Sequence, residues 1–214
     1  MDVVITGARR GIGAGLADLY HKRGDTVFAT SRGGRGIGAL DVADSHDQAR
    51  FAQELDGRAI DLLVCNAGIY ADKGQAIDGG YDAQMWADTF ATNVTGVFLT
   101  VQALLPNLRK AQSAKIAIIS SQMASSTHAP GGSYIYRASK AAALNLGRNL
   151  ASDLKRDGIA VGIYHPGWVK TDMGGESADI TIEASVAGLA ARFDALGLEN
   201  TGCFETWDGR AHDY

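Results

Sequence analysis

Short apolar runs, rich in Val and Ile, alternate along the chain with longer stretches in which apolar residues recur every three or four positions. The runs lie at 3–5, 26–30, 37–41, 60–65, 115–120, 159–164 and 203–205. Such runs are typical of parallel strands buried on both faces. The stretches between most of them predict helices, the last from about 182 to 196. We therefore expect a doubly wound, Rossmann-type α/β fold, a single domain over residues 1–214, with a mostly parallel central sheet of about seven strands flanked by helices.

Two stretches depart from this alternation. Residues 33–38 are rich in glycine and leave too little helix-forming sequence before Asp41, so we expect the helix between the second and third strands to be missing. The helical stretch from about 81 to 110 contains Asn93 and Gly96. Asn is a poor helix former because its side chain competes for backbone hydrogen bonds. A local kink is therefore expected there, and kinks are frequent at functional sites.

Composition narrows the class of protein. The 214 residues are 46% apolar and 21% charged, as in an ordinary globular domain. The net charge of -4 argues against nucleic acid as a partner. No apolar run reaches the length of a membrane span, and Met1 is not followed by a basic region that would open a signal peptide. Cys65 and Cys203 are isolated and predict reduced thiols. We expect a cytoplasmic protein with no membrane or nucleic-acid partner.

The first predicted strand leads into a glycine-rich turn and then a helix, with the spacing G-x-x-x-G-x-G. Glycines let the backbone approach phosphates, and a helix N-terminus presents free N–H groups and a positive dipole end. Such a turn alone is weak evidence, but its place at the first strand–helix junction favours a dinucleotide pyrophosphate site. The candidate cofactor-binding residues in it are Gly7, Arg9, Arg10, Gly11, Ile12 and Gly13.

The end of the second strand indicates which dinucleotide is bound. An acidic residue there would bind the ribose 2′-hydroxyl of NAD, but the sequence has Arg32 instead, with Arg9 and Arg10 in the first turn. Arginines at this end suit a 2′-phosphate. We therefore expect NADP(H) to be preferred over NAD(H). For Arg9, a merely solvated position is about equally consistent with the sequence.

Candidate chemistry comes from Tyr136 and Lys140, which a helix places one turn apart on the same face. An ammonium roughly 4 Å from the phenol, at an effective dielectric of about 20, favours the phenolate by on the order of 4 kcal/mol. That is roughly 3 pKa units, which would bring the phenol near 7. A proton donor and acceptor in this range suits carbonyl–alcohol chemistry. Taken alone, the same pair is in most sequences an ordinary helix pair.

The whole chain resembles the short-chain dehydrogenase/reductase family, because its motifs occur in that family's order. The phrases YRASKAAALN and HPGWVKTDMGG are most similar to the sniffer-type and C-factor-like carbonyl reductases. The matching stretches are the glycine turn at 6–13, Asp41-Val42, Asn66-Ala67-Gly68, Asn93, Ser120-Ser121, Tyr136 to Lys140 and Pro166-Gly167.

The resemblance implies a role for each matched position. Tyr136 would be the general acid–base. Lys140 would lower its pKa and bind the nicotinamide ribose, Ser121 would bond the substrate carbonyl oxygen, and Asn93 would hold a water in a proton relay behind Lys140. The other implied cofactor-binding positions are Asp41 at the adenine amino group, Thr171 at the nicotinamide carboxamide, and Val42, Asn66, Ala67, Gly68, Pro166, Gly167 and Val169. Asn66 is equally well placed to tie the sheet together.

Some features depart from the family pattern. Ser121 lies fifteen positions before Tyr136, slightly more than is common, so Ser120 and Ser125 stay open as alternatives. Tyr134 has the usual spacing to Ser121 but no Lys four residues later, and we reject it. The segment after Met173 is short, which predicts a reduced substrate lid.

The sequence thus predicts an NADP(H)-dependent oxidoreductase that interconverts a small to medium aldehyde or ketone and its alcohol. The family often dimerises through helices, so we expect a homodimer or homotetramer. The alternative is a non-catalytic NADP(H)-binding sensor or signalling protein on the same fold. An epimerase or dehydratase of the extended branch is disfavoured because the chain lacks a separate substrate domain.

Overall fold

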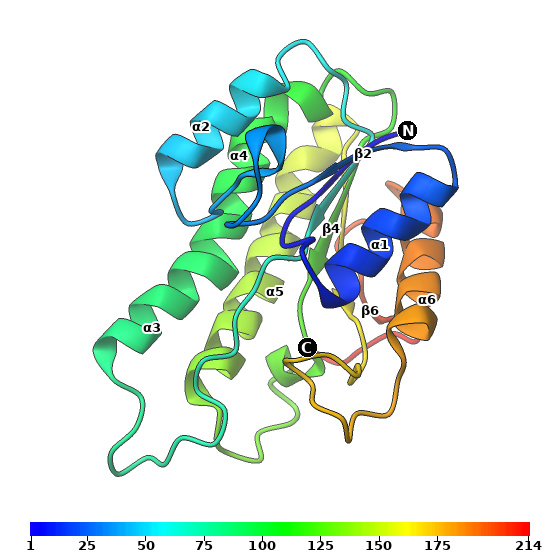
Figure 1. The fold of residues 1–214 in the computed structure, drawn as a ribbon. Coiled ribbons are helices and arrows are strands. Elements are labelled where there is room, and N and C mark those ends of the chain that lie inside the picture. The colour runs from blue at the N-terminus through cyan, green and yellow to red at the C-terminus, as the bar shows by residue number, and fades with distance from the viewer.

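The computed structural model describes all residues 1–214 and contains one six-stranded sheet (Figure 1). Its order is β2-β1-β3-β4-β5-β6, and every neighbouring pair is parallel. The doubly wound α/β fold is therefore confirmed. The strands are β1 (Asp2–Ile5), β2 (Thr26–Ala29), β3 (Leu62–Cys65), β4 (Lys115–Ile119), β5 (Ala160–His165) and β6 (Phe204–Thr206).

Helices cover both faces of this sheet (Figure 1). They are α1 (Gly11–Lys22), α2 (Ser45–Glu54), α3 (Ala83–Phe90), α4 (Gly96–Leu108), α5 (Tyr134–Leu154) and α6 (Ile182–Ala195). Helices α1 and α6 pack together on one face, and α2, α4 and α5 lie on the other.

The core is divided by the sheet because successive side chains of a strand point to opposite faces. In β1, Val3 and Ile5 join the α1/α6 layer, whereas Val4 joins the α2/α4/α5 layer. All three side chains are fully buried. This is why the strand sequences are apolar throughout instead of alternating with polar residues.

One predicted strand does not form. Residues 36–38 are a single 3₁₀ turn, Gly36–Gly38, and Ala39 makes only one isolated parallel bridge, to Ser31. The prediction of a strand at 37–41 was therefore wrong, and the sheet has six strands. Without a helix between β2 and this segment, the chain is too short to lay a full strand along the edge. The missing second helix is confirmed.

The expected kink in the long helix is a π-helical turn, Ala91–Thr95, between α3 and α4. Asn93 lies in the middle of this turn and is buried. Such a turn adds a residue to the helix and turns a side chain out of its regular direction. Here it directs Asn93 toward α5 and the segment after β3.

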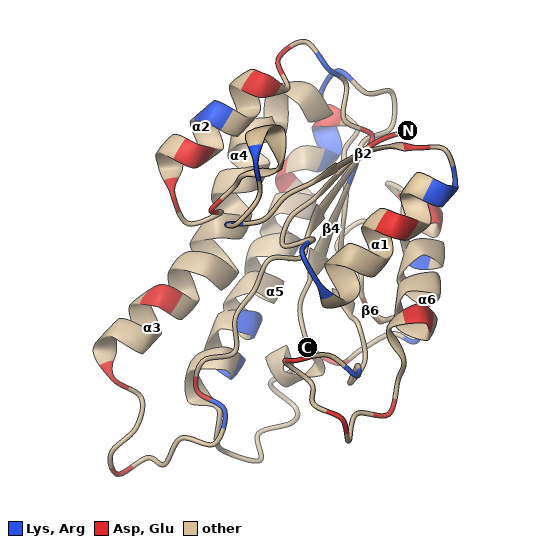
Figure 2. Cartoon of the chain, viewed as in Figure 1, with Lys and Arg blue, Asp and Glu red and all other residues tan.

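The strand order places a ligand crevice between β1 and β3. From β1 the chain winds outward to β2 and then returns to β3 on the other side, and open α/β sheets bind ligands at such a switch, at the carboxyl ends of the strands. In Figure 2 the acidic and basic positions alternate along the outer helices and loops. No helix is long and apolar enough to cross a membrane.

Candidate active site

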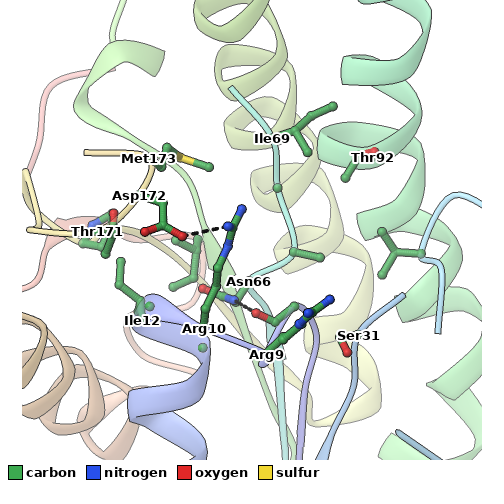
Figure 3. Close-up of a pocket in the computed structure, with 18 of the residues that line it drawn as sticks. Arg9, Arg10, Ile12, Ser31, Asn66, Ile69, Thr92, Thr171, Asp172 and Met173 are labelled. Carbon is green, nitrogen blue, oxygen red and sulfur yellow. Dashed lines mark hydrogen bonds and ion pairs between the residues drawn. The ribbon is translucent and has the colours of Figure 1, made fainter. Parts of the chain in front are cut away.

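A cavity of about 700 Å³ lies at the carboxyl ends of the strands (Figure 3). The turns that follow β1, β2, β3, β4 and β5 all contribute to its wall, as does the start of α5. The turn after β1 supplies Gly7, Arg9, Arg10, Gly11, Ile12 and Gly13. The other predicted cofactor residues that line it are Arg32, Asp41, Val42, Asn66, Ala67, Gly68, Tyr136, Lys140, Pro166 and Thr171.

The glycines of the turn after β1 are needed because the turn after β3 packs closely against them. Gly7 has φ +68°, and a Cβ there would lie 2.7 Å from the Cα of Ala67. A Cβ on Gly13 would lie 2.5 Å from Nδ2 of Asn66. That amide donates to the backbone carbonyls of Thr6 at 2.9 Å and Gly7 at 3.1 Å. Asn66 therefore ties the turns after β1 and β3 together, and the glycines make this close approach possible.

The N-terminus of α1 faces the cavity with none of its own side chains capping it. Arg10 at the N-cap makes no capping hydrogen bond, and the first turn contains no acidic residue. A helix start leaves backbone N–H groups unpaired and carries a positive partial charge. This end of α1 fits a phosphate group.

The two arginines of the turn diverge, as Figure 3 shows. Arg10 turns toward the segment after β5, where Nη1 lies 2.7 Å from Oδ2 of Asp172. Arg9 extends toward the end of β2, and its Nη1 lies next to Gly33: a Cβ built on that glycine would be 3.1 Å away. Arg9, for which a solvated position was equally consistent with the sequence, therefore lies next to the end of β2, and Arg10 is directed away from it. Arg32, from the turn after β2, lines the cavity as well.

The segment after β5 contributes only some of its predicted residues. Pro166 and Thr171 line the cavity, but Gly167 and Val169 do not. Val169 is buried and bridges to Ile180, and a Cβ on Gly167 would press on the Ile180 side chain at 2.2 Å, so both residues shape the turn from inside. No helix forms between β5 and α6, consistent with a short lid.

Tyr136 and Lys140 line the cavity, whereas Ser121 does not line it and lies next to Tyr136 behind the wall. Tyr136 and Lys140 lie on α5 with only 8% and 5% of their surfaces exposed. The amine of Lys140 lies 5.6 Å from the centre of the Tyr136 ring and donates to the carbonyl of Ile119 at 2.9 Å. Ser121 follows β4, and its hydroxyl accepts from the N–H of Met123 at 3.1 Å.

The predicted low pKa of Tyr136 was wrong for this arrangement. Burial of the phenol raises its pKa to about 12, and the influence of the neighbouring Ser121 hydroxyl only partly offsets this. Burial also lowers the pKa of Lys140 to about 8. The sequence argument assumed an ammonium in a partly hydrated site, but both groups are buried, and desolvation favours their neutral forms. At neutral pH the phenol is therefore protonated and ready to donate.

Asn93 binds protein groups with its whole amide. Oδ1 accepts from the N–H of Ile69 at 2.8 Å, and Nδ2 donates to the Ile69 carbonyl at 2.9 Å and to Oγ of Ser139 at 3.0 Å. Its side chain thus clamps the segment after β3 to α5. A Cβ on Gly68 would lie 3.3 Å from Oδ1 of Asn93 and 3.4 Å from Nζ of Lys140, so Asn93 and Lys140 meet at this glycine.

The residues considered as alternatives to Ser121 and Tyr136 lie elsewhere or bind other groups. Ser120 lines the cavity, but its hydroxyl donates to the carbonyl of Lys140 at 3.1 Å. The hydroxyl of Ser125 pairs with that of Thr127 at 2.7 Å. Tyr134 is 41% exposed at the start of α5.

Sequence reasoning missed part of the cavity wall. Ser31 and Gly33 also line the cavity. They could have been predicted, because they are the sequence neighbours of Arg32. Lys170 and Asp172 lie in the recognised phrase HPGWVKTDMGG but were given no role there. The others are Leu40, Ile69, Thr92, Ile119 and Ile182, which only the fold brings there. No group of three or more His, Cys, Asp or Glu residues is arranged to hold a metal ion.

Comparison with known proteins decides the family. The family model described as short chain dehydrogenase matches residues 2–180. The chain belongs to this family. It is 36% identical over 151 residues to a protein named C-signal from Myxococcus xanthus, covering 70% of this chain and 90% of that protein.

Solved structures of carbonyl reductases have the same fold as this short-chain dehydrogenase. The NADPH-bound carbonyl reductase from chicken fatty liver superposes with a TM-score of 0.90 at 31% identity, covering 100% of this chain and 98% of that one. The carbonyl reductase Sniffer of D. melanogaster gives 0.90 at 28% identity, covering 100% and 99%. The resemblance to the sniffer-type and C-factor-like branch is thus confirmed, and the protein is an oxidoreductase by family.

Proposed function

We propose that the protein is an NADP(H)-dependent carbonyl reductase or alcohol dehydrogenase acting on a small to medium aldehyde or ketone. The observation that supports this most is that Tyr136 and Lys140 both line the cavity, with Ser121 next to Tyr136 and the uncapped start of α1 in the same wall. We also propose that it works in the cytoplasm as a homodimer or homotetramer.

Each residue of the site has a role in this proposal. When bound, the nicotinamide cofactor supplies the hydride for reduction or accepts it in oxidation. Ser121 hydrogen-bonds the substrate oxygen, and the protonated phenol of Tyr136 donates a proton to it. Lys140 holds the nicotinamide ribose from a position fixed by the carbonyl of Ile119. Asn93 fixes the segment after β3 against α5.

The raised pKa of Tyr136 keeps the phenol protonated at neutral pH, which is the form that reduction requires. A phenol with a pKa of about 12 is fully protonated at neutral pH and acts as an acid. In alcohol oxidation the same group must first lose its proton, so the rate of oxidation is expected to rise with pH across the neutral and alkaline range.

The preference for NADP(H) rests on Arg9, Arg32 and Ser31. All three line the cavity by the end of β2, which we take as its adenosine end, and the turn after β2 carries no carboxylate. A 2′-phosphate accepts charge-assisted hydrogen bonds from guanidinium groups, each worth roughly 1.5–3 kcal/mol. Loss of the Arg9 guanidinium is therefore expected to weaken NADPH binding about ten- to a hundredfold and to leave NADH binding almost unchanged.

A non-catalytic NADP(H)-binding signalling protein is the second candidate. The observation that favours it is the likeness to a protein named C-signal. A pure sensor needs the adenosine end and the start of α1, but it has no use for the proton donor at Tyr136.

The test combines cofactor titration with turnover on a panel of aldehydes and ketones. We expect tighter binding of NADPH than NADH, a loss of this preference in Arg9→Ala, and NADPH-dependent turnover that falls by orders of magnitude in Tyr136→Phe while NADPH binding persists. Tyr134→Phe is the control, because it removes an exposed hydroxyl two residues earlier on the same helix. NADPH binding without turnover on any carbonyl would favour the sensor, and turnover retained in Tyr136→Phe would exclude the proposed mechanism.

A further inference from the structure

The first turn of α5, which carries Tyr136, is not capped by its own stretch of chain. Ser133 at the N-cap has the left-handed conformation, with φ 49° and ψ 43°, and makes no side-chain capping bond. Its hydroxyl instead pairs with that of Tyr70 at 2.5 Å. The first N–H groups of a helix need acceptors when they are buried, so α5 must obtain them from elsewhere.

Asp72 supplies these acceptors from the segment after β3. Its Oδ2 accepts from the N–H of Ile135 at 2.8 Å, and both carboxylate oxygens lie 3.3 Å from the N–H of Tyr136. Asp72 is fully buried and forms no ion pair with Lys or Arg. A buried carboxylate is costly unless it is bonded. The helix N–H groups and dipole therefore hold Asp72 in place, and Asp72 in turn holds the backbone of Tyr136.

The same segment packs on the Tyr136 ring. Tyr70 stacks against it with ring centres 4.2 Å apart and planes 19° apart. Ile69 is held by both bonds from Asn93. Residues 69–72, which we name the brace, are thus tied to Asn93 at one end and to α5 at the other, with the phenol ring between these ties.

We propose that Asp72 is a positioning residue for Tyr136, whose buried carboxylate fixes the first turn of α5 and so directs the phenol hydroxyl toward Ser121 and the substrate oxygen. This inference rests on the proposed reductase function. Asp72 acts only through Tyr136 and does not line the cavity. A misplacement of the donor by about 1 Å is enough to lower turnover about 10²-fold.

The charge of Asp72 gives a signature that a merely structural role does not share. The titratable groups that face the phenol are Lys140 on α5 and Tyr70 and Asp72 from the brace, and the turn after β4 contributes the neutral hydroxyl of Ser121. The negative charge of Asp72 is one of the contributions that raise the pKa of Tyr136. Its removal in Asp72→Asn is expected to lower that pKa, so the rate of alcohol oxidation should rise at a lower pH than in the wild type.

The experiment compares Asp72→Ala and Asp72→Asn with Asp82→Ala. Asp82 is the matched control because it caps α3, accepting from the N–H of Met85 at 2.9 Å. The measurements are kcat and KM for NADPH and the carbonyl, the pH profile of alcohol oxidation, and amide hydrogen exchange over residues 134–137 without cofactor. We expect about a 10²-fold loss of kcat in Asp72→Ala with little change in the KM for NADPH, faster exchange at 134–137, and the shifted pH profile in Asp72→Asn. Asp82→Ala should show none of these.

The outcomes separate this inference from the proposed function. If wild type reduces carbonyls and both Asp72 variants keep wild-type kcat, pH profile and exchange, positioning by Asp72 is overturned and the reductase stands. If Asp72→Ala does not fold, Asp72→Asn decides by its kcat and pH profile. If wild type binds NADPH but turns over no carbonyl, the proposed function fails and the positioning role fails with it.

Discussion

Replacing Lys140 by Met is expected to stabilise the protein at neutral pH while removing its activity. Met keeps the length and apolar stem of the Lys side chain, so it fits the same space. The substitution removes the amine of Lys140, a residue with only 5% of its surface exposed. This amine donates to the carbonyl of Ile119 at 2.9 Å. Burial of this amine lowers the stability of the folded protein, and the amine is kept because the proposed site needs it.

The size of the effect follows from the pKa of Lys140. Burial lowers it from 10.5 to about 8, which corresponds to about 3 kcal/mol of unfavourable free energy when the amine is protonated. Loss of the hydrogen bond to Ile119 costs about 1–2 kcal/mol in the other direction. The variant should therefore be about 1–2 kcal/mol more stable at pH 7, a rise in Tm of roughly 2–8 °C for a chain of this length.

The difference in stability between Lys140→Met and the wild type changes sign with pH. The unfolded chain keeps the Lys140 proton up to a pKa near 10.5, whereas the folded protein releases it near 8. Between these values the unfolded state binds more protons, so the wild type gains stability as pH rises. The gain is about 3 kcal/mol across this window and is absent in the variant, so the two stability curves should cross near pH 9.

Urea unfolding of wild type and Lys140→Met from pH 6 to pH 10.5 measures this directly. Lys115→Met is the control, because the Lys115 amine also donates to backbone carbonyls, those of Phe193 and Asp194, but lies partly exposed at the end of α6. We expect it to lose stability at every pH and to keep the wild-type pH dependence. A Lys140→Met variant that is less stable than wild type at pH 7, with a parallel pH profile, would refute the reasoning.

Two further outcomes follow from the cavity wall. Gly13→Ala should abolish NADPH binding and lower stability, because the new Cβ would lie 2.5 Å from Nδ2 of Asn66. Gly79→Ala is the control, because a Cβ there meets nothing within 4 Å. It should leave NADPH binding, measured by titration, and stability, measured by thermal unfolding, unchanged. Asp172→Asn should change stability by less than about 1 kcal/mol, because its ion pair with Arg10 is exposed. It should also tighten NADPH binding by freeing Arg10 for the cofactor phosphates, and weaker binding in a fluorescence titration would contradict this.

The sequence by itself determined the order of elements and most of the cavity. Buried parallel strands need apolar residues on both faces, so β1, β3, β4 and β5 are visible as apolar runs. Glycine turns and the Asn66-Ala67-Gly68 stretch are visible in the sequence because small residues are needed where backbones approach closely. A break in the helix at Asn93 was also predictable, because the propensity of a residue acts on its own stretch of chain.

Only the tertiary structure decided what depends on distant partners. Arg9 lies next to Gly33 and Arg10 pairs with Asp172, and both of these neighbours lie on other turns. Asp72 caps a helix that begins 62 residues later, and no pattern in either stretch announces that contact. The pKa values of Tyr136 and Lys140 were misjudged because spacing on a helix fixes the separation of two groups but not their burial, and in this site desolvation outweighs their mutual attraction.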